Sequence, residues 1–506
     1  MPGEGGRTGP EWWGLEAPGP TVTHVTPAGR TICLDMRAFV ERELKLELGE
    51  GFTLPDLPGE PLESRLFTST YHDTPDRSLA GAGITLRRRV ENGLSRWQLK
   101  LPRGGTARAE LEAPGGPAGP PPDIASLLTA HLRHGRLEPV ATLRTRRAGV
   151  RVADNGRMIA DVTLDSVAVL DAGRSAGAFA EIEIELVDGD DGDLERLGRT
   201  LRRAGAKTSD GKPKLMRVLP PPPRLRAPTA ATAVESLRVL LSEQVRELLR
   251  YDPGVRLGDD LEDVHRFRVA TRRSRALIRA TKPLLGDRLE ALGEELKWLA
   301  DLLGPVRDRD VLIERLRAET LRLDRDHAGG ETLVAQLEDE RERFRDELLV
   351  ALQSKRYLAL LDAFEAAVAS LPEVKSDRNA RGIAADEFRE LRRAAKRLPP
   401  VPADDELHAL RITAKRSRYA AELAATGRSA KELRRYLEAL KELQDVVGEH
   451  QDAVVAEETL RKLARARTAL AAGRLIECER LRRAEQRRLY PAALAAVLDR
   501  GAKALG

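Results

Sequence analysis

A proline-rich stretch, LPPPPRLRAPTAAT at residues 219–232, divides this 506-residue chain into two halves whose hydrophobic patterns have different periods. Before it, short runs alternate apolar and polar residues between Gly, Pro and Asp clusters, which predicts antiparallel β-strands. After it, Leu, Ala, Glu and Arg dominate with helical spacing. We therefore expect a flexible extension over 1–31, a β domain over 32–218, a semi-rigid linker over 219–232 and an all-α domain over 233–506.

Composition narrows the class of protein. With 33% charged and 41% hydrophobic residues, the chain is typical of soluble globular proteins. Cys33 and Cys478 have neither a disulfide-framework nor a zinc-site spacing, which favours a reducing cytoplasm. We expect no membrane contact, because the N-terminus lacks a signal-peptide pattern and no run nears the ~20 apolar residues that span a bilayer. Aromatic residues, at 4%, are too few for the usual stacking on single-stranded nucleic acid.

The helical half repeats itself. The pattern H-x-[FL]-R-[VI]-x-x-[RK]-R-S-R occurs at residues 265–275 and again at 408–418. A second pair of matching segments, 296–311 and 440–455, follows at nearly the same offset. Two ordered matches indicate a duplication, so we expect two similar four-helix bundles, about 233–385 and 386–504, related by a pseudo-twofold axis.

Charged residues alternate along several predicted strands. Glu41, Glu43 and Lys45 share one face of a strand, and residues 181–185 place three carboxylates on one face and isoleucines on the other. Basic residues of matching parity lie on the strands between them. One such strand is most often the solvated face of a sheet, but a closed barrel of roughly eight strands turns one face of every strand inward.

A lumen with both signs of charge is costly unless the charges are paired or bound to a ligand. Carboxylates provide the oxygen ligands that Mg²⁺ and Mn²⁺ prefer, and Arg and Lys neutralise phosphate oxygens. The combination predicts metal-assisted transfer of a phosphoryl group to water.

The ordered motifs of the β half resemble those of the CYTH family, the triphosphate tunnel metalloenzymes, over nearly all of residues 32–218. The motifs are Glu41-x-Glu43-x-Lys45, Tyr71-His72-Asp73-Thr74, Leu86-Arg87-Arg88-Arg89, Trp97-Gln98-Leu99-Lys100, Arg108-x-Glu110-x-Glu112, Arg144-Thr145-Arg146, Leu164-Asp165 and Glu181-Ile182-Glu183. The resemblance implies an eight-stranded antiparallel tunnel that binds a linear triphosphate with Mg²⁺ or Mn²⁺ and hydrolyses its terminal phosphate.

The same resemblance implies roles for individual residues. Glu41 and Glu43 would be catalytic. The metal-side carboxylates would be Glu41, Glu43, Glu181, Glu183, Glu185 and Asp165, and the triphosphate ligands Lys45, Arg87, Arg89, Lys100, Arg108, Arg144, Arg146 and Lys214. The family also contains adenylate cyclases and thiamine triphosphatases. No convincing aromatic platform for a base or a thiazolium is visible, so inorganic tripolyphosphate is the leading substrate.

A basic stripe marks each helical repeat. At 100° per residue, the first stripe, from His265 to Arg279, falls within an arc of about 80°, and no acidic residue interrupts it. The second copy repeats the histidine and the spacing, which favours a binding surface over a solvated face. Three histidines, His265, His408 and His450, would have to converge to bind a metal. We favour phosphate as the ligand of the stripes.

The helical motifs resemble the CHAD domain, the conserved histidine α-helical domain, over residues 233–504. The resemblance implies basic surfaces for long-chain polyphosphate, often at polyphosphate granules. The expected ligands are His265, Arg268, Arg272, Arg273, Arg275, Arg279, Arg307, His408, Arg411, Lys415, Arg416 and Arg418. The second copy carries Gln451, Val454 and Glu422 in place of Arg307, Asp310 and Arg279, so its basic face should be weaker. We expect structural roles for four repeated residues: Gly304 and Gly448 mark helix ends or a close approach of helices, and Asp308 and Asp452 cap helices or orient the arginine stripe.

The charge patterns and family resemblances of the two halves together predict a metal-dependent tripolyphosphatase. Its helical domain would target it to polyphosphate. Two alternatives remain: a polyphosphate-binding adaptor without turnover, and a nucleic-acid-binding protein. Metal-dependent phosphate release distinguishes the first alternative, and binding that polyphosphate fails to displace distinguishes the second.

Overall fold

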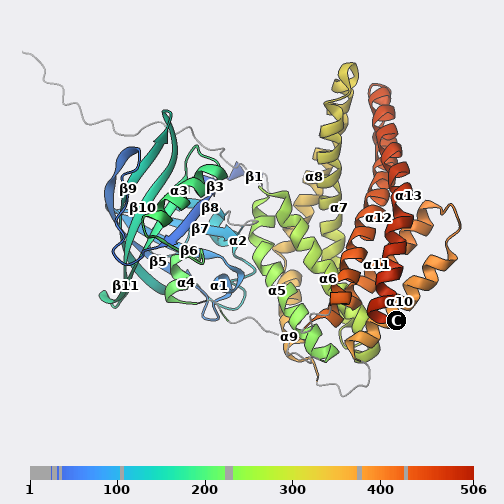
Figure 1. The fold of residues 1–506 in the computed structure, drawn as a ribbon, viewed down its shortest axis with the longest axis horizontal. Helices are drawn as coiled ribbons and strands as arrows, with labels where there is room; N and C mark the ends of the chain where they lie inside the picture. Colours follow the sequence, from blue (N-terminus) through green and yellow to red (C-terminus); the bar gives the residue numbers. More distant parts are fainter. Residues whose placement is uncertain are drawn as a thin grey trace, which may run out of the picture. The chain divides into compact units, whose positions relative to one another are not determined.

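The computed structural model describes residues 24–25, 31–32, 37–102, 108–220, 222, 232–372, 379–426 and 431–506, with side chains from Arg42 onward. The chain forms two compact units, drawn in Figure 1. The first contains Met1–Ser126 and Arg136–Pro221, and the second Leu127–Gly135 and Pro222–Gly506. Most of the predicted linker and N-terminal extension, and Cys33, lie outside the described residues.

The first unit is built on one antiparallel sheet with the strand order β12-β4-β11-β10-β9-β5-β6-β7-β8-β3. Two further strands, β1 and β2, form a separate two-stranded antiparallel sheet. The strands are β1 His24–Val25, β2 Thr31–Ile32, β3 Arg37–Glu41, β4 Glu43–Glu47, β5 Gly59–Asp73, β6 Thr85–Glu91, β7 Leu94–Pro102, β8 Arg108–Pro114, β9 Glu138–Asp154, β10 Arg157–Asp171, β11 Arg174–Leu186 and β12 Lys207–Thr208. Four short helices join or cover them: α1 Ser78–Ala82, α2 Pro122–Leu127, α3 Asp191–Arg203 and α4 Lys214–Val218.

The sheet closes on itself at Arg42. Only this residue separates β3 from β4, yet β3 pairs with β8 at one end of the strand order, and β4 pairs with β11 and β12 at the other. Counting β3 and β4 as one interrupted strand, and leaving out the two-residue β12, gives the eight long strands of the predicted barrel. The expectation of one unbroken strand through Glu41, Glu43 and Lys45 was wrong, because the chain changes neighbours at Arg42.

The alternating sequence of β11 determines which side of the barrel is apolar. Ile182 and Ile184 are fully buried on the outer face, where Leu197 and Leu201 of α3 cover them. The glutamates between these isoleucines face the lumen for the same reason of parity. Burying each such aliphatic side chain stabilises the fold by about 1.5–3 kcal/mol, so the outer apolar layer holds the charged positions inward.

Helix α4 lies at one end of the barrel. Its Leu215 is buried against Tyr71, Leu143 and Val167, which lie on the inward faces of β5, β9 and β10. This apolar cluster fills that end of the lumen and brings Lys214, at the start of α4, to the charged part.

The second unit is helical, as predicted. Its helices are α5 Ala233–Leu257, α6 Leu261–Leu285, α7 Glu290–Thr320, α8 His327–Leu352, α9 Lys355–Ala369, α10 Ala380–Arg397, α11 Asp404–Ala425, α12 Lys431–Leu463 and α13 Ala469–Leu505, with a 3₁₀ turn η1 at Asp324–Asp326. The repeated motifs make α6 equivalent to α11, and α7 equivalent to α12. Figure 1 shows α7 with α8, and α12 with α13, as two long antiparallel pairs.

Among the described residues, no helix combines the length and the apolar composition that a bilayer crossing requires.

Candidate functional site

The lumen of the barrel forms a cavity of about 490 Å³, lined mostly by charged and polar side chains. Strands far apart in the sequence contribute to it, because each turns its alternate positions inward. The predicted residues that line it are Glu43, Lys45, Arg87, Arg89, Lys100, Arg108, Glu183, Glu185 and Lys214. The side chain of Glu41, predicted as a catalytic and metal-binding residue, lies outside the described residues.

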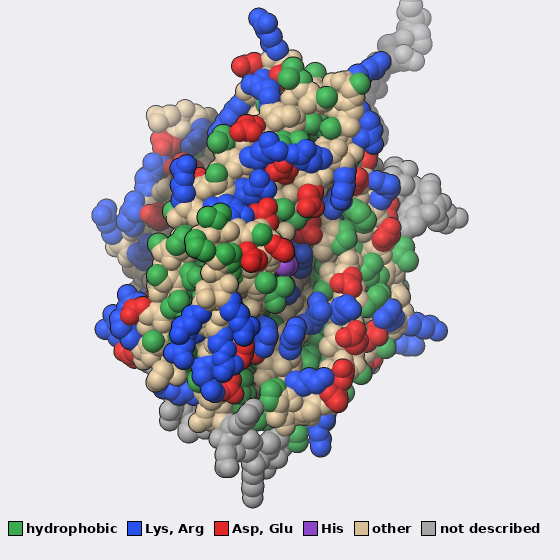
Figure 2. Space-filling model, turned by 90° about the vertical axis from the view of Figure 1, so that its right-hand side faces the viewer, with side chains coloured by type: hydrophobic (Ala, Val, Ile, Leu, Met, Phe, Trp, Pro, Cys, Tyr) green, Lys and Arg blue, Asp and Glu red, His purple; other side chains and the backbone are tan. Residues whose placement is uncertain are grey.

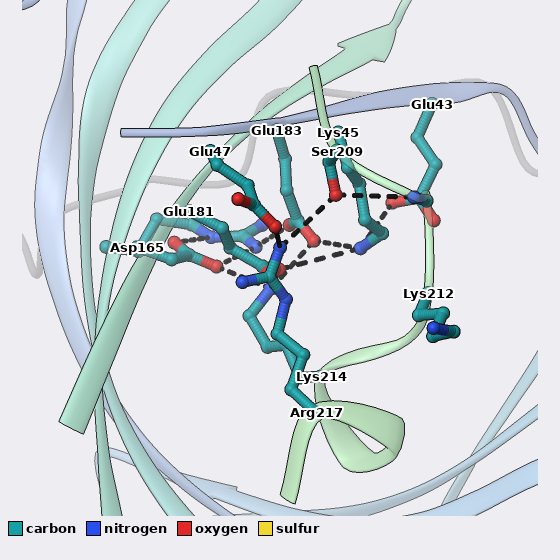
Figure 3. A network of polar contacts seen from close by, with 12 residues as sticks. Glu43, Lys45, Glu47, Asp165, Glu181, Glu183, Ser209, Lys212, Lys214 and Arg217 are labelled. Carbon is teal, nitrogen blue, oxygen red and sulfur yellow. Dashed lines mark hydrogen bonds and ion pairs between the residues drawn. The ribbon is translucent and has the colours of Figure 1, made fainter. Parts of the chain in front are cut away.

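Three buried carboxylates meet beside this cavity (Figure 3). Asp165 on β10 and Glu181 and Glu183 on β11 each place one oxygen within 4.8 Å of the others. They meet because Asp165 is the direct cross-strand partner of Glu181. The ammonium group of Lys214, reaching up from α4, lies between 2.6 and 2.9 Å from an oxygen of each of the three.

Two further cations contact these carboxylates. Arg147 on β9 donates two hydrogen bonds to Asp165, at 2.8 and 2.7 Å, and also contacts Glu183. Lys45 on β4 is buried, contacts Glu183 and lies 3.2 Å from a Glu43 oxygen. Positive and negative side chains therefore surround one another closely in this part of the lumen, where water is largely excluded.

Burial and the neighbouring cations act in opposite directions on the carboxyl groups. Burial raises the pKa of Glu181, and the attraction of Lys214 and Lys45 only partly offsets it. Burial also disfavours the charged form of Glu183, but the two lysines and Arg147 outweigh burial and hold the pKa of Glu183 well below its usual range. Glu183 is thus ionised at neutral pH, and Glu181 is the less well stabilised carboxylate.

The three carboxylates fit a divalent cation. Both oxygens of Glu181 are buried, and each lies close to a cation: one is 2.6 Å from the Lys214 ammonium and the other 3.2 Å from the Arg217 Nε atom. Burying this negative charge is costly without a compensating cation, and Mg²⁺ and Mn²⁺ bind carboxylate oxygens of this kind. Asp165, Glu181 and Glu183 could hold such an ion at the edge of the cavity, with Glu43 close by.

Strands β5 to β8 supply a second group of charges to the lumen. Lys100 lies 2.7 Å from Glu110, and Arg87 lies 3.9 Å from the same carboxylate. The guanidinium of Arg89 lies 3.6 Å from the centre of the Phe67 ring. Burial and the nearby Arg87 lower the pKa of Arg89 to about 10. An anion in the cavity would favour the charged form of this side chain.

The helical unit has a charged cleft of its own, about 520 Å³ in volume, between α6 and α7 of the first repeat and α11 and α12 of the second. Six of the predicted basic residues line it: His265, Arg268, Arg272, Arg307, His408 and Arg411. The two repeats thus place their equivalent histidines and arginines in one cleft.

Two glycines of the repeated motifs lie close to arginines of this cleft. Gly304 and Gly448 lie inside α7 and α12, not at helix ends. A β-carbon on either glycine would lie about 4 Å from a guanidinium nitrogen, of Arg268 in one repeat and of Arg411 in the other. Asp308 accepts a hydrogen bond of 2.7 Å from Arg268, so it orients the stripe and caps no helix.

Part of the positive charge in the cleft is uncompensated. The Nε atoms of Arg272 and Arg411 are buried and have no hydrogen-bond partner. Burial and the nearby Arg272, Arg411 and Arg268 lower the pKa of Lys415 to about 7, and Asp452 offsets this only in part. Buried donors without partners, beside a lysine that is losing its charge, are typical of a site that binds an anion.

Comparison with known proteins identifies both halves. A CYTH domain model matches residues 40–214 and a CHAD domain model matches residues 239–461. The uncharacterized protein Rv2226 of Mycobacterium tuberculosis is 32% identical over 459 residues, which cover 83% of this chain and 88% of that protein. The chain belongs to the CYTH–CHAD family. CYTH proteins bind triphosphate substrates with a divalent metal and include triphosphatases and cyclases.

Solved structures resemble the two halves separately. The CHAD domain from the plant Ricinus communis is 29% identical, covers 55% of this chain and 95% of its own, and has a TM-score of 0.45. The PH1819 protein from Pyrococcus horikoshii is 20% identical, covers 35% of this chain and 98% of its own, and has a TM-score of 0.24.

The structure contradicts the prediction that Arg144 and Arg146 bind the triphosphate in the CYTH barrel. Arg144 and Arg146 are exposed on the outer face of β9, where they cannot reach the cavity. Arg147 and Arg151 line the cavity in their place. The error is a shift of one residue, which in a strand moves a side chain to the opposite face.

Other lumen residues carried no predicted role. Glu110 and Glu112 were recognised only as part of a motif, although their alternation with Arg108 already indicated a shared face. The remaining unpredicted polar residues lining the cavity include Glu63, Arg65, Tyr71, Thr85, Gln98, Arg151, Asp161 and Thr163. Lys214, which was predicted as a triphosphate ligand, and its neighbour Pro213 also line the cavity.

The CHAD unit places the rest of the predicted basic residues outside the cleft. Arg273 and Arg418 both pair with Glu422, at 2.9 and 3.1 Å, and Arg416 pairs with Glu387. Figure 2 shows one face on which Lys and Arg side chains gather, interspersed with Asp and Glu. Acidic residues thus neutralise part of the basic surface that the sequence pattern suggested.

The third histidine considered as a metal ligand does not join the other two. His450 is buried, with its Nε2 atom 3.2 Å from an oxygen of Asp404. His265 and His408 line the cleft instead. The three histidines therefore form no common metal site.

Proposed function

We propose that the CYTH barrel is a divalent-metal-dependent triphosphatase that hydrolyses inorganic tripolyphosphate. The cluster of Asp165, Glu181 and Glu183 beside a lumen rich in Arg and Lys supports this proposal most directly. Oxygen ligands for a cation and basic ligands for phosphates are adjacent, which is the arrangement that metal-assisted phosphoryl transfer requires.

The residues of this chain have distinct tasks in such a reaction. A bound Mg²⁺ or Mn²⁺ would neutralise charge on the phosphate oxygens. Lys214 and Arg147, which contact the carboxylates without substrate, can turn to phosphate oxygens once a cation takes over those carboxylates. Arg87, Arg89 and Lys100 would hold the rest of the chain of phosphates and stabilise the charge on the transferred group.

The composition of the lumen favours an inorganic substrate over a nucleotide. Tyr71 is the one aromatic residue that lines the cavity among the described residues, and Arg87 donates to its hydroxyl at 3.3 Å. A purine base would find no stacking surface there. We therefore expect faster phosphate release from tripolyphosphate than from ATP.

Phosphate release by the full chain tests this proposal, with tripolyphosphate and ATP compared in Mg²⁺, Mn²⁺ and EDTA. We expect release from tripolyphosphate that depends on metal. Polyphosphate binding without any release would favour the alternative, a polyphosphate adaptor that lacks turnover.

We further propose that the CHAD cleft binds long-chain polyphosphate and so brings the protein to polyphosphate, including its granules. The unpartnered Nε atoms of Arg272 and Arg411 support an anionic ligand. A flexible chain of phosphates can contact both repeats at once, because His265 and His408 line one cleft. Duplex nucleic acid is the competing ligand, and polyphosphate should displace it.

Polyphosphate binding is expected to strengthen about tenfold as the pH falls from 8 to 6, because the ligand restores the charge of Lys415. Lys415 lies near the arginines of the cleft, and without a ligand its pKa is about 7, so this amine is mostly neutral at pH 8 and charged at pH 6. Fluorescence anisotropy with labelled polyphosphate at constant ionic strength measures the change. Calorimetry at pH 8 in two buffers should detect the uptake of nearly one proton.

The Lys415→Arg variant is the control for this effect. An arginine stays charged over the whole range, so most of the pH dependence and the proton uptake at pH 8 should disappear. A wild-type affinity that does not change with pH, or an equal change in the variant, would show that Lys415 is not the group responsible.

Removing the negative charge of Glu422 should extend the basic surface that Arg273 of α6 and Arg418 of α11 form. Glu422 neutralises Arg273 and Arg418, so Glu422→Gln should raise polyphosphate affinity severalfold and steepen its salt dependence by about one to two counterions. Glu390→Gln, which removes an exposed pair with Arg393 on α10, is the matched control. Unchanged affinity and slope in Glu422→Gln would mean that polyphosphate does not reach Arg273 and Arg418.

A further inference from the structure

A short segment of the CYTH half of the sequence is built into the helical unit. Leu127–Gly135 start at the last residue of α2 and end before β9, yet they belong to the second compact unit. Ala130 is fully buried in the main apolar core of the helices. His131 is 2% exposed, which is unusual for a histidine in a connecting loop.

A proline in α5 leaves a backbone carbonyl of that helix available to the side chain of His131. Pro253 has no N–H group, so it cannot donate to the carbonyl of Leu249, four residues earlier in the helix. The Nε2 atom of His131 lies 2.8 Å from this carbonyl oxygen. A carbonyl only accepts, so Nε2 carries the proton and donates. Burial lowers the pKa of His131 to about 4, which keeps the ring neutral in this role.

Charged contacts fix the end of the segment on α9. Arg133 donates to Asp362 at 2.9 Å and lies 2.5 Å from Glu365, and its own side chain is only 5% exposed. His134 lies 2.8 Å from the same Asp362. His134, Asp362 and Glu365 have the composition of a metal site, but Arg133 already neutralises both carboxylates. These three side chains therefore suit an ion-paired contact between the segment and α9 better than they suit a metal ion.

We propose that residues 127–135 are a docking segment whose partner is the helix pair α5 and α9 of the helical unit. The proline linker is then not the only connection between the catalytic and polyphosphate-binding halves. The docked segment holds them together without covalent continuity. It combines an apolar anchor, a hydrogen bond to the carbonyl that Pro253 leaves without its helical donor, and ion pairs of the buried Arg133 with two partly exposed carboxylates.

Cutting the linker tests this proposal in the full chain. A protease recognition sequence placed within residues 223–230 allows the folded protein to be cleaved into two fragments. We expect the fragments to co-elute in size-exclusion chromatography and to appear as one complex in native mass spectrometry. Fragments that separate in the otherwise wild-type protein would overturn the proposal.

Variants in the segment identify the contact responsible. Arg133→Glu places like charges together and should weaken the association of the cleaved fragments by about 10²-fold or more. Arg136→Glu, an exposed position just beyond the segment, makes the same change in charge and should leave the complex intact. Association that survives Arg133→Glu combined with His131→Leu would also overturn the proposal, because another contact would then hold the fragments.

Discussion

The Glu181→Gln variant is expected to lose at least 10²-fold in metal-dependent phosphate release from tripolyphosphate while it keeps its fold. Glutamine has the shape of the buried glutamate but lacks its charge, so it removes one anionic oxygen ligand from the cation site. Because burial already raises the pKa of Glu181, a neutral side chain of the same size is tolerated here. Mn²⁺ binding, measured by electron paramagnetic resonance, should weaken in parallel with turnover.

The control for this variant is Glu195→Gln on α3, whose side chain is 76% exposed. It makes the same chemical change on the same unit, away from the cavity, and should leave Mn²⁺ affinity and turnover unchanged. Thermal unfolding of both variants separates loss of the site from loss of the fold. Wild-type metal affinity in Glu181→Gln would contradict the assignment of the metal site.

Replacing Arg147 should reduce kcat/KM for tripolyphosphate about 10²-fold, whereas replacing its neighbour Arg146 should change it less than about twofold. Arg147 lines the cavity and contacts Asp165 and Glu183, so it can stabilise charge that develops on the transferred phosphate. Arg146 is exposed on the outer face of the same strand. Arg147→Met and Arg146→Met make this comparison with one substitution.

The two arginine variants also test the strand register. Breaking the contacts of Arg147 removes one of the cations that pair with Asp165 and Glu183 and is expected to lower stability as well, so turnover is compared at a temperature where both variants are folded. A larger loss of activity in Arg146→Met than in Arg147→Met would mean that β9 presents its other face to the lumen.

The inward face of residues 181–186 in β11 could be predicted from the sequence, because charged and aliphatic residues alternate strictly there. Isoleucines alternate with glutamates there, and only one assignment buries the isoleucines under α3. The segment around Arg144 gave no such contrast, since Arg144, Arg146 and Arg147 occupy both parities. The spacing of Arg147 and Arg151, four residues apart, was the available signal for the correct face.

The basic stripe of α6 was predicted as one continuous surface, and the structure divides it. His265, Arg268 and Arg272 face the cleft shared with the second repeat, whereas Arg279 lines a separate pocket with Arg416. Helical periodicity predicts which side chains share a face. It does not predict where a packed neighbouring helix covers that face and where it leaves it open.

Contacts between residues far apart in the sequence could not be predicted, because the residues around each partner do not indicate the other partner. Nothing in the run around His131 indicates that it meets a carbonyl freed by Pro253, more than a hundred residues later. The approach of Lys214 to three carboxylates likewise depends on how α4 enters the barrel. Such contacts arise from tertiary packing, which the pattern of one segment does not encode.

The most direct test of the central claim is phosphate release from tripolyphosphate by the full chain, with Mg²⁺ or Mn²⁺ against an EDTA control and with Glu181→Gln as the inactive reference. The structure predicts equal amounts of phosphate and pyrophosphate in the presence of metal, and only background release with EDTA or with the variant. Release that persists in EDTA, or no release in any metal although the protein binds Mn²⁺, would contradict a metal-dependent triphosphatase in this barrel.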